Sequence, residues 1–410
     1  MPPREFILNH PVIQKNKVIY SWSPQGPFTS ASYYVEYPDL SEIKSSPGKL
    51  AEGYLAVCVA LAALGEVRLT LPVQLDGGVL DRWRHLSQIF GRRLFRRPGR
   101  CLIENGQEPP AYETFSTEKT ALFFGGGAES LLAMARLLES GVTPFLISAG
   151  GPGWRGSDPE INPDKSRLDG QLASDLGLQV LRIRTNFRQI IGPESGWSAY
   201  LRPGVSPMNA ALFTPLFISL SLPLCERFGL KRLVQGHERM NDPKDYFCFS
   251  PPAAAALEAV AFGVSYESRL NDLYKQNICH ELYTRHPALL RYQYSCWKNK
   301  GERWCHECEA CFRYFLLLKI EGIRSEEVGL DSRRIFSNLP KILRDVLRSP
   351  ECYPNEIWGY LYNHPALRKE DALRKILDRL KFQAGVFKVI HDVYLKMRSR
   401  FFTPPNKPRR

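Results

Sequence analysis

The sequence predicts an α/β protein built around a Rossmann-like parallel sheet, and two observations predict this fold class. Short runs of β-branched and aromatic residues alternate with longer amphipathic segments between residues 118 and 325. The predicted helices stop at glycines and the predicted strands run into glycine-rich or polar turns, as in consecutive right-handed βαβ units. On this basis the 410 residues divide into an N-terminal α+β accessory domain (1–117), an α/β core (118–325) and a basic helical C-terminal extension (326–410).

The accessory domain is expected to combine strands with helices. Residues 18–22, 31–37 and 67–71 are rich in β-branched and aromatic residues and partly alternate with polar ones, which is typical of strands. The segment 50–64 is rich in Ala and Leu and is predicted to be a helix. Arg82–Arg100 contains seven arginines and no acidic residue. This run favours a solvated helix face, with a site for a partner as the alternative.

The core is predicted to alternate strands with helices. The strands are expected at 121–124, 144–148, 179–183 and 232–234, and the helices at 129–138, 164–176 and 209–228. Parallel sheets of this kind bind ligands at the carboxyl ends of their strands. The segments that follow the strands, namely 125–130, 148–151 and 236–242, are therefore expected to lie along one edge.

The apolar segment 210–225 is expected to be a buried helix rather than a membrane span. It is shorter than the roughly 20 residues that a span needs, and it contains Pro215 and Pro223. No apolar run with a small-residue cleavage site follows Met1, so no signal peptide is expected. We therefore expect a cytoplasmic protein without membrane association, whose ten cysteines stay reduced.

The formal net charge of +13 is concentrated near the C-terminus. Residues 331–410 contain 18 Lys or Arg and 8 Asp or Glu. Within them Leu373, Ile376, Leu377 and Leu380 keep helical spacing, so a folded amphipathic segment is expected. A basic surface suits an acidic protein or RNA as partner, but charge by itself indicates neither a fold nor a reaction.

A glycine cluster, Gly125-Gly126-Gly127, lies between a predicted strand and a predicted helix. Glycines let backbone N–H groups approach an anion closely, and the helix N-terminus adds partial positive charge, so this segment is suited to bind phosphate. Ser130 offers a hydroxyl donor, while Glu129 can either help to hold Mg²⁺ or cap the first turn. The cluster matches neither the Walker loop nor the dinucleotide-binding glycine motif. A tight turn without a ligand is the alternative.

Four cysteines form a C-x8-C-x2-C-x2-C array: Cys296, Cys305, Cys308 and Cys311. Four thiolates this close together can complete the tetrahedral coordination of Zn²⁺. Iron–sulfur clusters also use two-residue gaps between cysteines, and spacing does not exclude them. Because a four-thiolate zinc site has no open position, its expected role is structural. Cys58 and Cys225 lie in apolar helices and are expected to pack as small hydrophobic residues.

Together these two features resemble one family. Gly125–Ser130 resembles a variant of the PP-loop of the ATP pyrophosphatases, whose pattern is Ser-Gly-Gly-x-Asp-Ser. The cysteine array, with Tyr294-Ser295 before it and Trp297 after its first cysteine, resembles the zinc site of the 7-cyano-7-deazaguanine synthase (QueC) family. The resemblance covers residues 118–322 approximately. Three further segments follow in the family's order. Residues 147–150 fall where the family's second strand meets the nucleotide base, and Asn209 resembles the Asn of its Val-Pro-x-Arg-Asn segment. Residues 236–242 resemble its substrate loop.

The resemblance implies an ATP-dependent C–N ligase of PP-loop type. Such an enzyme adenylates the carboxylate of 7-carboxy-7-deazaguanine, or of a related deazapurine acid, and an amine then attacks the acyl group to give an amide or, after dehydration, a nitrile. Its cofactors would be ATP, Mg²⁺ and a structural Zn²⁺. The implied site residues are Glu129 and Ser130 for catalysis, Gly125, Gly126, Gly127, Ser130 and Ser148 for ATP, and Asn209, Gly236, His237, Glu238 and Asp242 for the substrate.

The sequence departs from the family pattern in three places. Gly125 replaces the first serine of the loop, Glu129 replaces its aspartate, and Met208 replaces an arginine. With the added N-terminal domain and basic extension, the chain resembles the longer QueC-like proteins of bacterial anti-phage defence islands (CBASS and Qat types). That branch implies a partner protein as the amine acceptor, in place of ammonia. The family resemblance also leaves a homodimer open.

Two other functions remain as alternatives. Some PP-loop enzymes modify tRNA, and a basic extension would track RNA phosphates with a steep dependence on salt. Against this, no RNA-recognition motif is visible and the cysteine array matches the enzymes of small substrates better. The other alternative is a catalytically inactive nucleotide-binding scaffold, suggested by Gly125 and Glu129.

Overall fold

The computed structural model describes residues 5–55, 67–94, 101–106, 118–150, 163–191, 213–239, 264–296, 303–348, 356–383 and 385. The chain separates into two compact units, Met1–Arg303 and Trp304–Arg410. Among the helices of the described ranges, none has the length and apolarity to cross a membrane. The three-part division expected from the sequence stays a prediction.

Five parallel strands form the centre of the first unit, in the order β11-β10-β7-β8-β9. Their alternation with helices confirms the predicted α/β class and the largely parallel sheet. The strands are β7 (Lys119–Phe123), β8 (Phe145–Gly150), β9 (Gln179–Thr185), β10 (Leu230–Gly236) and β11 (Ser265–Arg269). The chain moves outward from β7 to β8 and β9, then returns to place β10 on the other side of β7.

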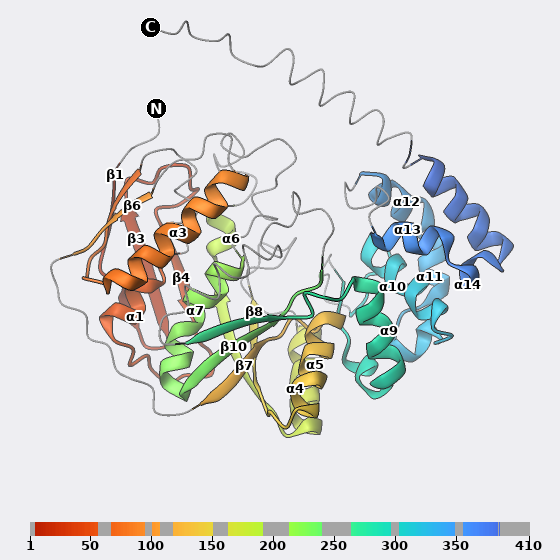
Figure 1. The fold of residues 1–410 in the computed structure, drawn as a ribbon, viewed down its shortest axis with the longest axis horizontal. Coiled ribbons are helices and arrows are strands. Elements are labelled where there is room, and N and C mark those ends of the chain that lie inside the picture. Colours follow the sequence, from red (N-terminus) through yellow and green to blue (C-terminus); the bar gives the residue numbers. More distant parts are fainter. Residues whose placement is uncertain are drawn as a thin grey trace, which may run out of the picture. The chain divides into compact units, whose positions relative to one another are not determined.

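Helices cover both faces of this sheet (Figure 1). The helices α4 (Ala128–Glu139) and α5 (Pro163–Leu176) connect β7 to β8 and β8 to β9, while α7 (Phe213–Phe228) leads back to β10. Right-handed crossovers in opposite directions place α4 and α5 on one face and α7 on the other. The gap between β7 and β10 is therefore a topological switch point, where such sheets bind ligands at the carboxyl ends of the strands.

The N-terminal strands extend the same sheet to eleven strands. The strand β4 (Ser32–Glu36) pairs antiparallel with β9, and the order continues through β3 (Lys17–Ser23). The remaining elements of this part are β1 (Glu5–Leu8), β2 (Val12–Gln14), β5 (Val67–Thr70), β6 (Cys101–Glu104), α1 (Pro47–Glu52) and α3 (Gly77–Leu94). Buried side chains of this part share one hydrophobic core with the α/β strands. The accessory residues are thus continuous with the core sheet.

Several elements differ from the sequence prediction. The helix expected at 50–64 is interrupted, because α1 ends at Glu52 and Gly53-Tyr54 form a turn; residues 56–66 lie outside the described ranges. The arginine run is helical in α3 as far as Leu94, beyond which residues 95–100 are not described. Sequence reasoning missed β11, because its segment Ser-Tyr-Glu-Ser-Arg is polar and half-buried. Hydrogen bonding to β10, rather than local hydrophobicity, makes it a strand.

The second unit is helical in its described part, as expected for the C-terminal extension. Its centre is α10 (Glu309–Ile320), buried along nearly its whole length. Trp304 is buried before this helix, and its indole N–H donates to the Val328 carbonyl at 2.9 Å. Around α10 the chain forms η5 (Ser325–Val328), α11 (Ser332–Ser337), α12 (Leu339–Arg348), α13 (Glu356–Asn363), α14 (Pro365–Arg368) and a helix over 371–383. Leu373, Leu377 and Leu380 are buried and Ile376 is half-buried, so the predicted amphipathic spacing is confirmed for the three leucines.

Candidate functional site

The glycine loop lies at the switch point, between the end of β7 and the start of α4. Gly126 has a positive φ of 74°, a backbone conformation that suits glycine. A Cβ at Gly126 would lie 3.2 Å from the Cβ of Tyr294, so a side chain has little room. Gly127 is the N-cap of α4 and provides no side-chain cap. The first N–H groups of α4 are therefore free of a side-chain cap, as an anion-binding helix N-terminus requires.

The end of β10 faces this loop across the switch point. A Cβ on Gly236 would come within 2.6 Å of the Glu129 carbonyl oxygen, so only glycine lets β10 approach α4 this closely. The next residue, His237, is buried and its N–H donates to the Arg269 carbonyl at 2.9 Å. Burial lowers the pKa of His237 to about 3, so its imidazole is neutral near pH 7. Gly236 and Glu238 thus lie near the first turn of α4, as the sequence predicted for one strand edge, whereas His237 is held by its backbone bond to Arg269.

A lysine joins the two sides of the switch point. Lys275 begins α9 (Lys275–Arg285) and forms ion pairs with Glu129 and with Glu238, the latter at 3.3 Å. The three side chains are between 10 and 23 % exposed, so water screens these pairs less than at an open surface. The backbone N–H of Arg239 donates to the Leu273 carbonyl at 2.7 Å, which holds the end of β10 against the segment before α9.

Sequence reasoning missed Lys275, because the strand that places it was itself missed. Once β11 is recognised beside β10, its carboxyl end must lie at the same edge as the ends of β7 and β10. Lys275 follows this strand by six residues. The signal that could have found it is therefore a polar strand followed by a lysine at a helix start.

Ser148 lies inside β8 and is fully buried beside a second lysine. Its hydroxyl donates to Oδ2 of Asp169 at 2.7 Å. Lys165 of α5 forms an ion pair with Asp169 at 2.6 Å, also donates to the Ser148 hydroxyl oxygen, and contacts the Phe124 carbonyl at 3.4 Å. The Ser148 hydroxyl is therefore part of a buried cluster of three side chains behind the glycine loop.

The remaining predicted residues have different placements. Ser130 is buried in the first turn of α4, and its hydroxyl donates to the Gly127 carbonyl at 3.1 Å. Asn209 and Asp242, predicted for the substrate, lie outside the described residues. Glu129, predicted as catalytic, is 23 % exposed and directed to Lys275.

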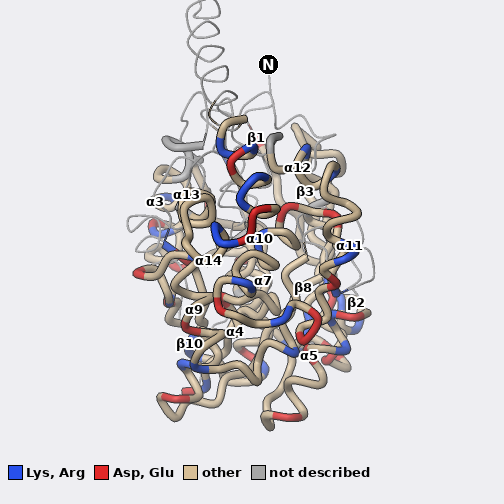
Figure 2. The backbone as a smooth tube through the Cα atoms, turned by 90° about the vertical axis from the view of Figure 1, so that its right-hand side faces the viewer, with Lys and Arg blue, Asp and Glu red and all other residues tan. Residues whose placement is uncertain are grey.

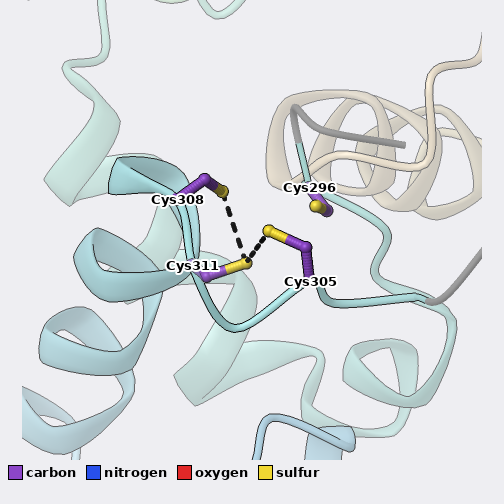
Figure 3. Close-up of side chains that lie close together, drawn as sticks. All are labelled: Cys296, Cys305, Cys308 and Cys311. Carbon is purple, nitrogen blue, oxygen red and sulfur yellow. Dashed lines mark hydrogen bonds between the residues drawn. The ribbon is translucent and has the colours of Figure 1, made fainter. Parts of the chain in front are cut away.

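The four predicted cysteines come together in one buried cluster (Figure 3). Their sulfur atoms all lie within 4.8 Å of one another, with Cys305 and Cys308 at 3.8 and 3.5 Å from the sulfur of Cys311. Tetrahedral Zn–S bonds of about 2.3 Å place neighbouring sulfurs about 3.8 Å apart, so the cluster could hold a metal ion and is compatible with Zn²⁺. Thiolates bound to four different irons would have to stand farther apart, and the spacing therefore favours a single ion.

Local structure explains how three of these cysteines converge. His306 has a positive φ of 58°, which turns the chain between Cys305 and Cys308. Cys308 is the N-cap of α10, and Cys311 lies in the first turn of that helix. The partial positive charge of a helix N-terminus favours thiolates at such positions.

The residues just before Cys296 touch the glycine loop. The N–H of Tyr294 donates to the Gly126 carbonyl at 2.6 Å, and Ser295 Oγ lies 3.8 Å from the position of a Cβ on Gly127. Half-buried Arg303 holds this segment by donating to the Gln293 carbonyl at 2.7 Å and to the Leu290 carbonyl at 2.5 Å. Burial lowers the pKa of Arg303 to about 10, yet it stays protonated at neutral pH.

Comparison of the chain with known family models and with curated proteins finds no match. The chemistry of the site therefore has to be argued from its own residues. The described ones offer glycine N–H groups and a helix N-terminus for an anion, and two carboxylates bridged by a lysine.

Proposed function

We propose that the protein is an ATP-dependent C–N ligase of the PP-loop type. The observation that carries this proposal is the meeting of the glycine loop, Glu129 and Glu238 at the switch point of a parallel sheet, bridged by Lys275. A loop with closely approachable N–H groups at a helix N-terminus suits the phosphates of a nucleotide. Lys275 holds Glu129 and Glu238 together beside this loop, so that a carboxylate for Mg²⁺ lies next to the expected phosphates.

The proposed reaction begins with activation of a carboxylate. A substrate carboxylate oxygen attacks the α-phosphorus of ATP, the bond to the bridging oxygen breaks, and pyrophosphate leaves. The N–H groups of Gly125–Gly127 and the start of α4 stabilise the negative charge that develops on pyrophosphate. Bound Mg²⁺, with Glu129 as the carboxylate that would help to hold it, would neutralise phosphate charge.

The second step transfers the acyl group to an amine. The amine attacks the acyl carbon, AMP leaves, and the amine loses one proton as the amide forms. His237 is not assigned as the acceptor of this proton, because burial lowers its pKa to about 3 and makes its imidazole a weak base near pH 7. The chemistry needs positioned groups and no nucleophilic cysteine.

The proposed acid is 7-carboxy-7-deazaguanine or a related deazapurine acid. The amidine edge of a guanine-like ring presents adjacent N–H donors, which a carboxylate such as Glu238 can accept in pairs. We propose Zn²⁺ as the ion of the cysteine cluster, in a structural role, because four thiolates leave it no open position. A partner protein of a defence operon is the proposed amine acceptor, with ammonia as the simpler alternative.

The test is ATP-dependent pyrophosphate release by the full chain with 7-carboxy-7-deazaguanine, followed by mass analysis of the products. We expect pyrophosphate release to depend on both ATP and the acid. The Glu129→Gln variant is expected to release pyrophosphate at least about tenfold more slowly, since it loses a charge that positions Lys275 and Mg²⁺. Glu281→Gln removes a similarly half-buried carboxylate from an ion pair with Arg136 on α4 and serves as the control. Absence of release and of ATP binding in the unmodified protein would overturn the proposal. Free nitrile from ammonia alone would exclude the partner protein as acceptor.

An RNA substrate is supported less well by the described surface. Basic and acidic residues are interspersed along the described backbone (Figure 2). In the second unit many cations are paired with carboxylates, as in Lys319–Glu370 and Lys341–Glu307, both at 2.6 Å. Paired cations release fewer counterions from nucleic acid than free ones. The ligase proposal therefore does not extend to RNA, and pyrophosphate release that required tRNA would replace it.

A further inference from the structure

The glycine loop is held at two of its carbonyl groups. Lys165 Nζ lies 3.4 Å from the Phe124 oxygen, and the Tyr294 N–H donates to the Gly126 oxygen at 2.6 Å. In a trans peptide the C=O and the following N–H point in opposite directions, and the described chain has its only cis bond at Ser23-Pro24. Holding these two carbonyls therefore turns the N–H groups of Gly125 and Gly127 away from the residues that hold them.

Both of these N–H groups are available to a ligand. Within the described ranges, neither of them donates a hydrogen bond. Gly125 is exposed, and a Cβ placed on it would meet nothing within 4 Å. An anion could thus approach the loop from the side opposite Lys165 and Tyr294.

Lys165 is itself fixed with little freedom. Its side chain is 12 % exposed and Asp169 is 3 % exposed, so the ion pair is nearly removed from water. Asp169 accepts from Lys165 and from Ser148 through the same oxygen, Oδ2. Its other oxygen, Oδ1, lies 3.9 Å from the position of a Cβ on Gly126. The ion pair of Lys165 with Asp169 and the bond from Ser148 already join α5 to β8. That role does not require the Lys165 ammonium to contact the Phe124 carbonyl, the last one before the glycine loop.

We propose that Lys165 is a positioning residue for phosphate binding: held by Asp169 and Ser148, it fixes the Phe124 carbonyl so that the Gly125 N–H faces the ligand. This inference rests on the proposed function, because it assumes that the glycine loop binds the phosphates of ATP. Lys165 acts through the backbone and does not itself touch the ligand. Its ammonium charge is balanced by Asp169, so its contribution is orientation of the loop rather than attraction of the anion.

The test measures binding of inorganic pyrophosphate and of ATP to the full chain by calorimetry, together with amide spectra of protein labelled with ¹⁵N-glycine. We expect pyrophosphate to shift the Gly125 and Gly127 amides in the unmodified protein. Lys165→Met is expected to weaken pyrophosphate binding at least about tenfold, since the loop N–H groups lose their orientation. Lys165→Arg keeps a donor near the Phe124 carbonyl and should restore part of the affinity.

Two further variants separate positioning from folding. Lys165→Met combined with Asp169→Asn removes both charges, so no buried carboxylate is left unpaired to unfold the chain. Arg136→Met breaks another ion pair of α4 farther along the helix, with Glu281 at 2.6 Å, and should leave pyrophosphate affinity unchanged. Equal affinity and equal glycine spectra in the folded double variant and the unmodified protein would overturn the positioning role. If the unmodified protein binds neither pyrophosphate nor ATP, the proposed function itself fails.

Discussion

At the scale of single residues, two lysines determine the charge balance of the candidate site. Lys275 meets Glu129 and Glu238, while Lys165 meets Asp169. Each cation is therefore compensated before any ligand binds, and each is mostly buried. Removing one partner of such a pair leaves an unpaired buried charge, which typically lowers the free energy of unfolding by about 3–5 kcal/mol. Substitutions at these positions are thus best made on both partners together.

His237 predicts a dependence of stability on pH. Its pKa is lowered to about 3 by burial, whereas the unfolded chain has an ordinary histidine pKa of about 6.5. Above about pH 6.5 the residue is neutral in both states and contributes no pH dependence. Below that pH only the unfolded state binds the proton, so the free energy of unfolding should fall by up to about 1.4 kcal/mol per pH unit. Urea unfolding at several values between about pH 5 and pH 7 measures this slope.

The variant His237→Gln isolates the contribution of this residue. All other titrating groups are shared with the unmodified protein, so the difference between the two slopes belongs to His237. We expect the variant to have the shallower slope between about pH 6.5 and pH 5. Identical slopes would mean that His237 has the same pKa in the folded and the unfolded protein, and hence that it is not buried from solvent.

At the scale of elements, the glycines decide how closely strands and helices approach. Gly236 allows β10 to lie against the first turn of α4, where any Cβ would come within 2.6 Å of the Glu129 carbonyl. Gly126 allows the segment before Cys296 to pass the loop. The sequence pattern indicated a turn at the glycine cluster but could not indicate these contacts, since each involves a residue far away in the chain.

The four-cysteine cluster is predicted to hold a metal ion that stabilises the start of α10. Cys308→Ser should remove one of four ligands, and with it the bound metal and much of the thermal stability, because structural zinc contributes apparent binding energies of about 10–16 kcal/mol in small domains. The metal content of the purified protein, measured by mass spectrometry, and the melting temperature check this. We expect about one zinc ion per chain in the unmodified protein.

A matched control uses a cysteine outside the cluster. Cys279 is also buried, but it lies in α9 and not among the four clustered sulfurs. Cys279→Ser should therefore keep its zinc. A Cys308→Ser protein with full zinc content would show that the cluster does not hold the ion, and iron in place of zinc would revise the metal but not the site.

At the scale of the whole molecule, the first unit has one continuous sheet. Backbone pairing joins β4 to β9, and the Tyr37 hydroxyl donates to the Leu220 carbonyl at 2.9 Å inside the core. The Asp39 carboxylate accepts from the Arg182 backbone N–H and side chain. Removing the N-terminal residues would expose the edge of β9 and the apolar surface of α7, both of which favour aggregation.

Truncation tests this continuity. We expect a chain of residues 118–410 to be insoluble or to melt well below the full chain, because it loses the paired edge strand and part of the shared core. Expression with size-exclusion chromatography and a thermal melt check this. A soluble, cooperatively folding fragment with the melting temperature of the full chain would show that residues 1–117 form an independent domain.

Prediction from sequence succeeded where local patterns carry the information. The glycine cluster, the helix α4 and the four cysteines follow from residue type and spacing, and the structure places each as expected. The strand β11 and Lys275 were missed because a polar strand is stabilised by its neighbour and not by its own residues. Asn209 and Asp242 stay predictions, since they lie outside the described residues.

By itself the sequence determined the α/β class, the position of the glycine loop between a strand and a helix, and the set of possible metal ligands. These depend on periodicity and on spacings of a few residues, which are local properties of the chain. Only the tertiary structure decided which side chains share the site. Strand order places Glu129, Glu238 and Lys275 together although up to 146 residues separate them. It does so because backbone hydrogen bonds between strands, which carry no side-chain signature, set that order.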